Sequence, residues 1–168
     1  MATVLGMGHA RTDSKEGAMA ASLVCAVDDS PSADEVVRVA VRMKERLDLR
    51  LVIAHAVPVR AIIGPTSSSY LYSPRSDLDQ EANKAREALL GIVGRTCGAS
   101  GADLRVLIGD PVETVLSLAE EEEAQLIVVG SRGRGALKAA LLGSVSAMLT
   151  KRASCPVTVV PPHARAEA

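Results

Sequence analysis

The chain has 168 residues, with 19 Lys and Arg against 20 Asp and Glu and a formal net charge of -1 at pH 7. That length suits one compact domain, and the balanced charge argues against a dedicated nucleic-acid binder, because affinity for a phosphate backbone needs an excess of basic residues on one face. Aromatic residues make up only 1%. The core is therefore expected to be aliphatic, and the aromatic platforms on which single-stranded nucleic acid stacks are missing.

The ends of the chain lack the patterns of targeting segments. Residues 1–21 hold no basic patch followed by an apolar stretch, as a signal peptide requires. No apolar run reaches the roughly 20 residues that cross a bilayer. The three cysteines are odd in number and widely spaced, which argues against a disulfide framework or a zinc knuckle. We expect a cytoplasmic protein with no membrane segment, a flexible leader at 1–21, one domain at 22–161 and a short tail at 162–168.

Between the ends, short apolar runs alternate with longer amphipathic stretches, which is typical of a parallel sheet built from βαβ units. The expected strands are residues 22–27, 51–57, 104–108, 125–129 and 156–160. The expected helices lie at about 31–48, at 77–95, after Asp110 and at 144–152. Five parallel strands and four helices predict a single open α/β sheet of the Rossmann-like class, with helices on both faces. Such sheets bind ligands beyond the carboxyl ends of their strands.

Local signals mark the starts of two helices. Ser30 stands before Pro31, a pattern typical of an N-cap followed by a proline in the first turn. Asp110 is followed three residues later by Glu113, an acidic version of the capping box. The glutamate run at 120–123 is most simply a solvated face.

Residues 58–74 form a Pro-, Gly- and Ser-rich segment that is too long for an ordinary connection between a strand and a helix. This segment is either a lid or a disordered loop.

A glycine-rich segment joins the fourth strand to the last helix. Gly130, Gly133 and Gly143 let the backbone approach an anion closely. The main-chain N–H groups that open the helix and the helix dipole attract negative charge. The hydroxyls of Ser144 and Ser146 can bond the same oxygens, and the basic residues of the segment, Arg132, Arg134 and Lys138, can neutralise a polyphosphate. The pattern favours a phosphate site.

Each of these residues also has a structural interpretation. The glycine segment can be a tight turn with Ser144 as the N-cap. Asp28 follows a strand, where a carboxylate caps a turn as often as it binds a ligand. His55 stands alone in an apolar strand, which is more typical of a core residue than of a general base.

The spacing Gly130-x2-Gly133-x9-Gly143-Ser144 resembles the nucleotide-binding motif of the universal stress protein family, in its ATP-binding branch. The resemblance covers about 22–160. Further matches are Val27-Asp28-Asp29-Ser30, Ile53-Ala54-His55-Ala56, Gly109-Asp110-Pro111, Leu126-Ile127-Val128-Val129-Gly130-Ser131 and Cys155-Pro156-Val157. Two positions depart from the family pattern, because Asp29 stands where glycine is common and Gln125 replaces a frequent acidic residue.

The resemblance implies the strand order 3-2-1-4-5 and an adenine nucleotide, ATP with or without Mg²⁺, across the carboxyl ends of the first and fourth strands. Asp28 then contacts the nucleoside, and the main chain of Ala26 and Ala56 lines the adenine site. The residues that border the ribose and the phosphates are Val129, Gly130 and Gly133, with Arg132 in the same loop. The residues that hold the phosphate chain are Gly143, Ser144, Val145 and Ser146.

The expected function is that of an ATP-binding regulatory protein in a stress response, with weak ATP hydrolysis at most. An adenylating enzyme on a related fold is a second interpretation, but residues 28–32 contain no glycine-rich pyrophosphate loop and the chain has no Walker A sequence. A third is an interaction module that binds no nucleotide. In the implied strand order the last strand is an edge, and Val157–Val160 carries no charge or proline, which predicts pairing into a homodimer.

Overall fold

The computed structural model describes residues 4–5, 21–59, 61–63, 70–72, 75–97, 101–131 and 142–162. The main sheet has the strand order β1-β6-β3-β2-β7-β8. The bounds of these strands are β1 (Val4–Leu5), β2 (Ser22–Val27), β3 (Arg50–Val57), β6 (Asp103–Ile108), β7 (Ala124–Gly130) and β8 (Val157–Val160). The last five strands are mutually parallel, which confirms the predicted order 3-2-1-4-5.

Two pairings are not predicted by the sequence pattern. β1 lies in the predicted leader and pairs antiparallel with β6, with Val4 opposite Leu107 and Leu5 opposite Val106. In the segment 58–74, β4 (Ala61–Ile63) and β5 (Tyr70–Tyr72) pair antiparallel as a separate two-stranded sheet. The β-branched and aromatic residues of these short runs favour strands, but three residues are too few to stand out from a Pro- and Gly-rich background.

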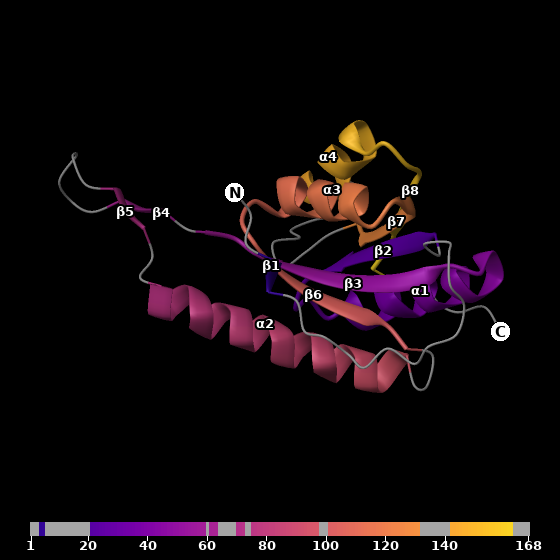
Figure 1. Cartoon of the computed structure of the whole chain (residues 1–168), viewed down its shortest axis with the longest axis horizontal. Helices are drawn as coiled ribbons and strands as arrows, with labels where there is room; N and C mark the ends of the chain where they lie inside the picture. Colours follow the sequence, from indigo (N-terminus) through magenta and orange to yellow (C-terminus); the bar gives the residue numbers. More distant parts are fainter. Residues whose placement is uncertain are drawn as a thin grey trace.

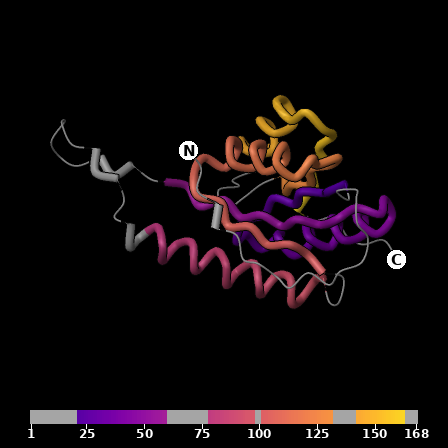
Figure 2. Tube along the Cα trace, viewed as in Figure 1, coloured from indigo at the N-terminus to yellow at the C-terminus, as the bar shows by residue number. Residues whose placement is uncertain are grey.

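The helices cover both faces of the sheet, as predicted. α1 (Ala33–Leu47) and α2 (Arg75–Thr96) lie on one face, and α3 (Pro111–Glu121) and α4 (Ser144–Arg152) lie on the other (Figure 1). The Cα trace shows the same two helix pairs on opposite sides of the strands (Figure 2). No helix within the described ranges is both long and apolar enough to cross a membrane.

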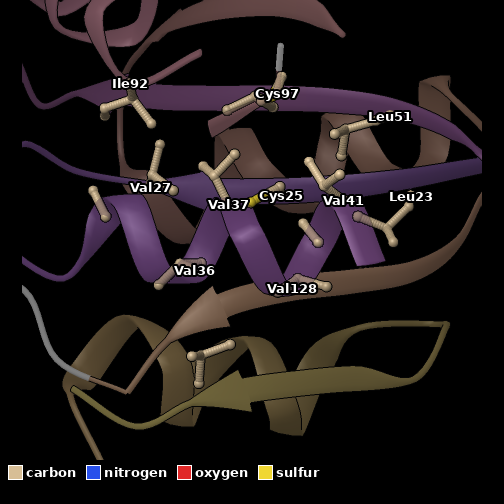
Figure 3. Packing of buried hydrophobic residues seen from close by; sticks show 14 of the residues in the cluster. Leu23, Cys25, Val27, Val36, Val37, Val41, Leu51, Ile92, Cys97 and Val128 are labelled. Atoms are coloured by element: carbon tan, nitrogen blue, oxygen red, sulfur yellow. The ribbon is translucent and has the colours of Figure 1, made fainter. Parts of the chain in front are cut away.

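The face under α1 and α2 carries the larger core. Leu23, Cys25 and Val27 alternate along β2 and pack against Val37 of α1, with Ile92 of α2 in the same cluster (Figure 3). Burial raises the pKa of the Cys25 thiol well above its ordinary value, so this free cysteine stays protonated and acts as a small apolar side chain.

The face under α3 and α4 carries the second core. Val24 and Ala26 of β2 point to this side, because successive side chains of a strand alternate between faces. They pack with Ile127 of β7, Leu118 of α3 and Leu149 of α4. β2 is therefore buried on both faces, as its almost entirely apolar sequence predicts.

The start of α1 differs from the prediction. The helix begins at Ala33 with Ser32 as its N-cap residue, and not at Pro31 with Ser30 as the cap. Ser30 is engaged elsewhere, since its N–H donates to Asp28 Oδ1 at 3.0 Å and its hydroxyl lies 3.0 Å from that of Ser32. The preceding turn thus displaces the helix start by two residues.

The N-cap residue of α3 is Asp110, as predicted. Asp110 Oδ1 accepts hydrogen bonds from the N–H groups of Val112 at 2.9 Å and Glu113 at 3.1 Å. The Glu113 carboxylate, which a capping box would use to close the turn, instead accepts from Arg152 of α4.

The interpretation of the glutamate run as a solvated face is wrong for Glu122, which is 7% exposed. Its carboxylate binds Arg50 of β3 and, at 3.1 Å, Arg105 of β6. Its carbonyl oxygen accepts from the Ser22 hydroxyl at 2.7 Å, and Arg50 also binds Asp103 at 2.6 Å. We call these five residues the amino-edge cluster, because they lie where β2, β3, β6 and β7 begin.

Glu122→Gln should lower the free energy of unfolding by about 1–3 kcal/mol. Removing one partner of a fully buried ion pair costs about 3–5 kcal/mol, and the partial exposure of both arginines reduces that cost. Urea unfolding measures the change. The matched control is Glu120→Gln, an exposed member of the same run, which should change stability by less than about 0.5 kcal/mol. Equal effects of the two substitutions would contradict the structural role of Glu122.

Candidate functional site

The strand order reverses between β2 and β7. From β2 the chain crosses through α1 to β3 on one side, whereas β7 lies on the other side of β2. In open parallel sheets, ligands bind at the carboxyl ends of the strands where this reversal occurs. Asp28 follows β2 and Ser131 follows β7, so both stand at this point. The predicted residues at the two strand ends are therefore brought together by the topology.

Three predicted site residues point to the face covered by α3 and α4. Ala26 is paired with Ala54 on β3 and with Val129 on β7, and Ala56 follows two residues beyond Ala54 on the same face. Three of these four side chains are single methyl groups, so the carboxyl half of this face is built from small residues. His55 points to the opposite face and is 5% exposed, in agreement with the predicted core position.

Asp28 forms a turn at the end of β2. Its Oδ1 accepts the N–H of Ser30 at 3.0 Å, two residues along the chain. This is the structural interpretation offered for Asp28 by the sequence, and it also fixes the direction of the carboxylate at the switch point. The turn therefore places a held carboxylate beside the small-residue face of β2.

Gly109 closes the neighbouring strand end. Its φ of 145° suits glycine, and its N–H donates to the carbonyl of Val57 at 3.0 Å. A Cβ at this position would lie 2.9 Å from Thr114 Cγ2, so α3 can start this close to β6 only behind a glycine. The run Gly109-Asp110-Pro111 thus combines a close approach, an N-cap and a proline at the first helical position.

The N-terminus of α4 differs from that of α3 in having no side-chain cap. Its N-cap residue is Gly143, with φ −60° and ψ 157°, and its first turn contains no acidic residue. The first N–H groups of a helix lack carbonyl partners within the helix. Those of Ser144, Val145 and Ser146 therefore form the positive end of a helix dipole, and no carboxylate of the first turn neutralises it.

The two serines of this turn have different surroundings. Ser144 is exposed, as a residue that contacts a ligand must be. Ser146 is 1% exposed, and its hydroxyl donates to the carbonyls of Gly143 at 3.0 Å and Ser131 at 3.3 Å. The hydroxyl is therefore bonded to main-chain carbonyls of the chain itself, as serine hydroxyls near a helix start often are, and the predicted bond from it to a phosphate stays a prediction. Its main-chain N–H remains at the helix start.

Ser131 is a site residue that the sequence interpretation missed. Its N–H donates to the carbonyl of Val160 at 2.7 Å, and its carbonyl accepts the N–H of Gly143 at 2.7 Å. A hydrogen bond thus joins the two ends of the segment 131–143, and the first of them is also bonded to β8. The only signal for this role in the sequence is the position of Ser131 directly after the glycine that ends β7.

An ion pair joins the two helices of this face. Arg152, at the end of α4, donates to both carboxylate oxygens of Glu113, at 2.5 and 3.0 Å. These hydrogen bonds lower the pKa of the Glu113 carboxyl below its ordinary value. The pair holds the C-terminal end of α4 against the first turn of α3.

Four basic or glycine positions of the predicted phosphate loop, Arg132, Gly133, Arg134 and Lys138, lie outside the described residues. In the described part of the chain no group of three or more His, Cys, Asp or Glu side chains could hold a metal ion. Of the residues predicted to hold the phosphate chain, the described ones are Gly143, Ser144, Val145 and Ser146 at the start of α4.

Comparison with known families decides the assignment. The profile of the Universal stress protein family matches residues 19–161, which include every strand of the parallel sheet. The chain belongs to the universal stress protein family. The resemblance inferred from the glycine spacing is thereby confirmed at the level of the family.

Two of the relatives match over nearly their whole length, and a third over part of it. A universal stress protein of Thermus aquaticus is 31% identical over 140 residues, which are 83% of this chain and 97% of that protein. The solved structure of UspA from Lactobacillus plantarum has a TM-score of 0.68 at 26% identity and covers 86% of this chain and 99% of that chain. The longer Rv2005c of Mycobacterium tuberculosis is 37% identical over 86 residues, 48% of this chain and 28% of that protein.

Two solved universal stress proteins contain adenine nucleotides. One, from Archaeoglobus fulgidus, is a complex with dAMP and matches with a TM-score of 0.57 at 21% identity, over 84% of this chain and 98% of that chain. Another is a complex with cAMP, with a TM-score of 0.55 at 24% identity, over 85% and 98%. At these identities the similarity establishes the shared fold.

Proposed function

We propose that this universal stress protein binds ATP at the carboxyl edge of β2 and β7 and acts in the cytoplasm as a nucleotide-dependent regulatory protein of the stress response. The observation that carries the proposal is the start of α4, which has no side-chain cap and no acidic residue and is hydrogen-bonded to the end of β7. A helix start of this kind is an anion-binding site. The adenine nucleotides in the two solved family members support the same class of ligand.

The roles follow from where each residue lies. We assign the main chain of Ala26 and Ala56 to the base, and the Asp28 carboxylate, which is held at the adjoining strand end, to the ribose. Val129 and Gly130 border the path from ribose to phosphates. The N–H groups at the start of α4 and the Ser144 hydroxyl bind the phosphates, and Mg²⁺, where it accompanies ATP, is assigned no protein ligand among the described residues.

Ser144→Ala should weaken ATP binding by roughly one to two orders of magnitude. It deletes one hydrogen bond to a charged group, worth about 1.5–3 kcal/mol. Adenosine lacks phosphates, so its affinity should scarcely change. Calorimetric titration of both ligands into both proteins measures the difference. Ser117→Ala, an exposed serine on α3, is the matched control and should leave both affinities unchanged.

Two outcomes would contradict this assignment. If ATP and adenosine lose affinity equally in Ser144→Ala, the substitution acts on the fold and not on a phosphate contact. If the wild-type protein binds neither ligand, the interaction module that binds no nucleotide becomes the better interpretation. In the second case the glycines are purely structural.

We expect turnover to be weak. In this proposal the described residues position the phosphates and supply positive potential, but they supply no positioned base. The rate of ATP hydrolysis should therefore be far below the ~10 per second of a median enzyme. Phosphate release from the purified protein under saturating ATP measures the rate. A rate near the enzyme median that Asp28→Asn abolishes would favour the alternative of an ATP-cleaving or adenylating enzyme.

We also infer a homodimer through β8. β8 ends the parallel sheet, pairs with β7 alone within the described sheet, and its four residues carry no charge or proline to prevent pairing with a second copy. Light scattering at micromolar concentration should give twice the chain mass of 17.5 kDa. Thr158→Lys places a charge on both paired strands and should shift the protein toward the monomer. A wild-type monomer at these concentrations would disprove the inference.

A further inference from the structure

We propose that Ser146 is a positioning residue, whose buried hydroxyl sets the place of the phosphate-binding turn of α4 relative to the end of β7. The inference rests on the proposed nucleotide function, because it concerns the same turn. In this role the Ser146 hydroxyl acts on the ligand site through the main chain of Ser131 and Gly143 and does not itself contact the ligand. The three residues involved, Ser131, Gly143 and Ser146, are called the serine junction below.

The serine junction gathers its hydrogen bonds at two carbonyl groups. The carbonyl of Ser131 accepts the N–H of Gly143 at 2.7 Å and the hydroxyl of Ser146 at 3.3 Å. The carbonyl of Gly143 accepts the same hydroxyl at 3.0 Å and the N–H of Ala147 at 3.0 Å. The hydroxyl therefore lies between the residue that leaves β7 and the residue that opens α4.

The junction is attached to the sheet, and its Ser146 side chain is shielded from water. The N–H of Ser131 donates to Val160 of β8 at 2.7 Å, which holds the peptide at the sheet edge. Ser146 is 1% exposed, so water does not replace its hydrogen bonds when they are lost. Loss of this hydroxyl should therefore loosen the start of α4, because no water molecule takes over its hydrogen bonds.

The absence of a side chain on the N-cap residue makes this role necessary. In α3 the Asp110 carboxylate fixes the first turn through two N–H groups. In α4 the cap is Gly143, which has no side chain and leaves the first N–H groups open to an anion. The Ser146 hydroxyl restrains the turn instead, through the carbonyls of Gly143 and Ser131. The first turn is therefore held by groups other than the N–H groups that a phosphate would contact.

The experiment compares Ser146→Val with Ser146→Thr. Both substitutions add a methyl group to the Cβ atom at the same buried site and give side chains of the same shape, but threonine keeps the hydroxyl whereas valine has a second methyl group in its place. We expect ATP affinity to fall about fivefold to tenfold in the valine protein relative to the threonine protein, as for the loss of one ordinary hydrogen bond. The affinity for adenosine should be the same in both. Calorimetric titration with ATP and with adenosine gives the four values.

Thr150→Val is the matched control on the same helix. The Thr150 hydroxyl donates to the carbonyl of Ser146 at 2.8 Å, so this substitution also removes a hydroxyl bonded to the helix backbone, but one turn beyond the junction. It should leave the affinity for ATP unchanged. If the valine substitution at 146 prevents folding, Ser146→Ala compared with wild type replaces the pair.

A second measurement separates the junction from the proposed function. Hydrogen exchange at the Gly143 amide, without nucleotide, should be at least severalfold faster in Ser146→Val than in Ser146→Thr, and unchanged in Thr150→Val. Equal exchange together with equal ATP affinity in the matched pair would overturn the positioning role. If the wild-type protein binds no ATP but the Gly143 amide still exchanges faster in Ser146→Val, Ser146 does hold the start of α4, but the nucleotide function is rejected. That result would overturn the proposal that the turn so held binds phosphate.

Discussion

The parallel pairing of β2 with β3 on one side and β7 on the other is the constraint on which the molecule depends. A strand in this central place is buried on both faces, so helices must cover both, and the chain must leave β2 and β7 toward different sides of the sheet. Asp28 and Ser131 each lie two residues beyond the paired Ala26 and Val129, at the carboxyl edge. The candidate site is thus a consequence of strand order before any particular side chain is considered.

Strand order alone does not place α4, because a long segment separates it from β7. The main chain of Ser131 fixes the helix start, because its carbonyl accepts the N–H of Gly143 while its N–H donates to the carbonyl of Val160 on β8. Main-chain hydrogen bonds therefore fix the position of the first turn of α4 relative to the sheet. Its N–H groups can face outward without a capping carboxylate. A conventional cap such as Asp110 on α3 would hold the helix equally well but would occupy the position of an anion.

Much of the fold was predictable because its signals are local. Apolar runs and helical spacing predicted all five parallel strands, and the start of α4 at Ser144 was predicted at its residue. The errors lie where a residue has a distant or competing partner. Ser30 has the sequence pattern of an N-cap, but it takes part in the turn in which its N–H donates to Asp28. Glu122 stands in an acidic run that suggests exposure to solvent, but it is paired with Arg50 and Arg105 of other strands. In the site, sequence spacing identified the glycines but could not show that the Ser146 hydroxyl turns inward.

Stability and binding are assigned to opposite ends of the strands. The ionic amino-edge cluster ties together the starts of β2, β3, β6 and β7, where Glu122 is buried between two arginines. At the carboxyl edge the site uses small side chains, a turn and main-chain groups, which bury few charges and cost little to leave exposed. Substitutions in the amino-edge cluster should therefore act on folding with little effect on ligand affinity. Substitutions of exposed groups at the carboxyl edge, such as Ser144, should act on affinity with little effect on folding, because a solvated helix start loses no buried partner.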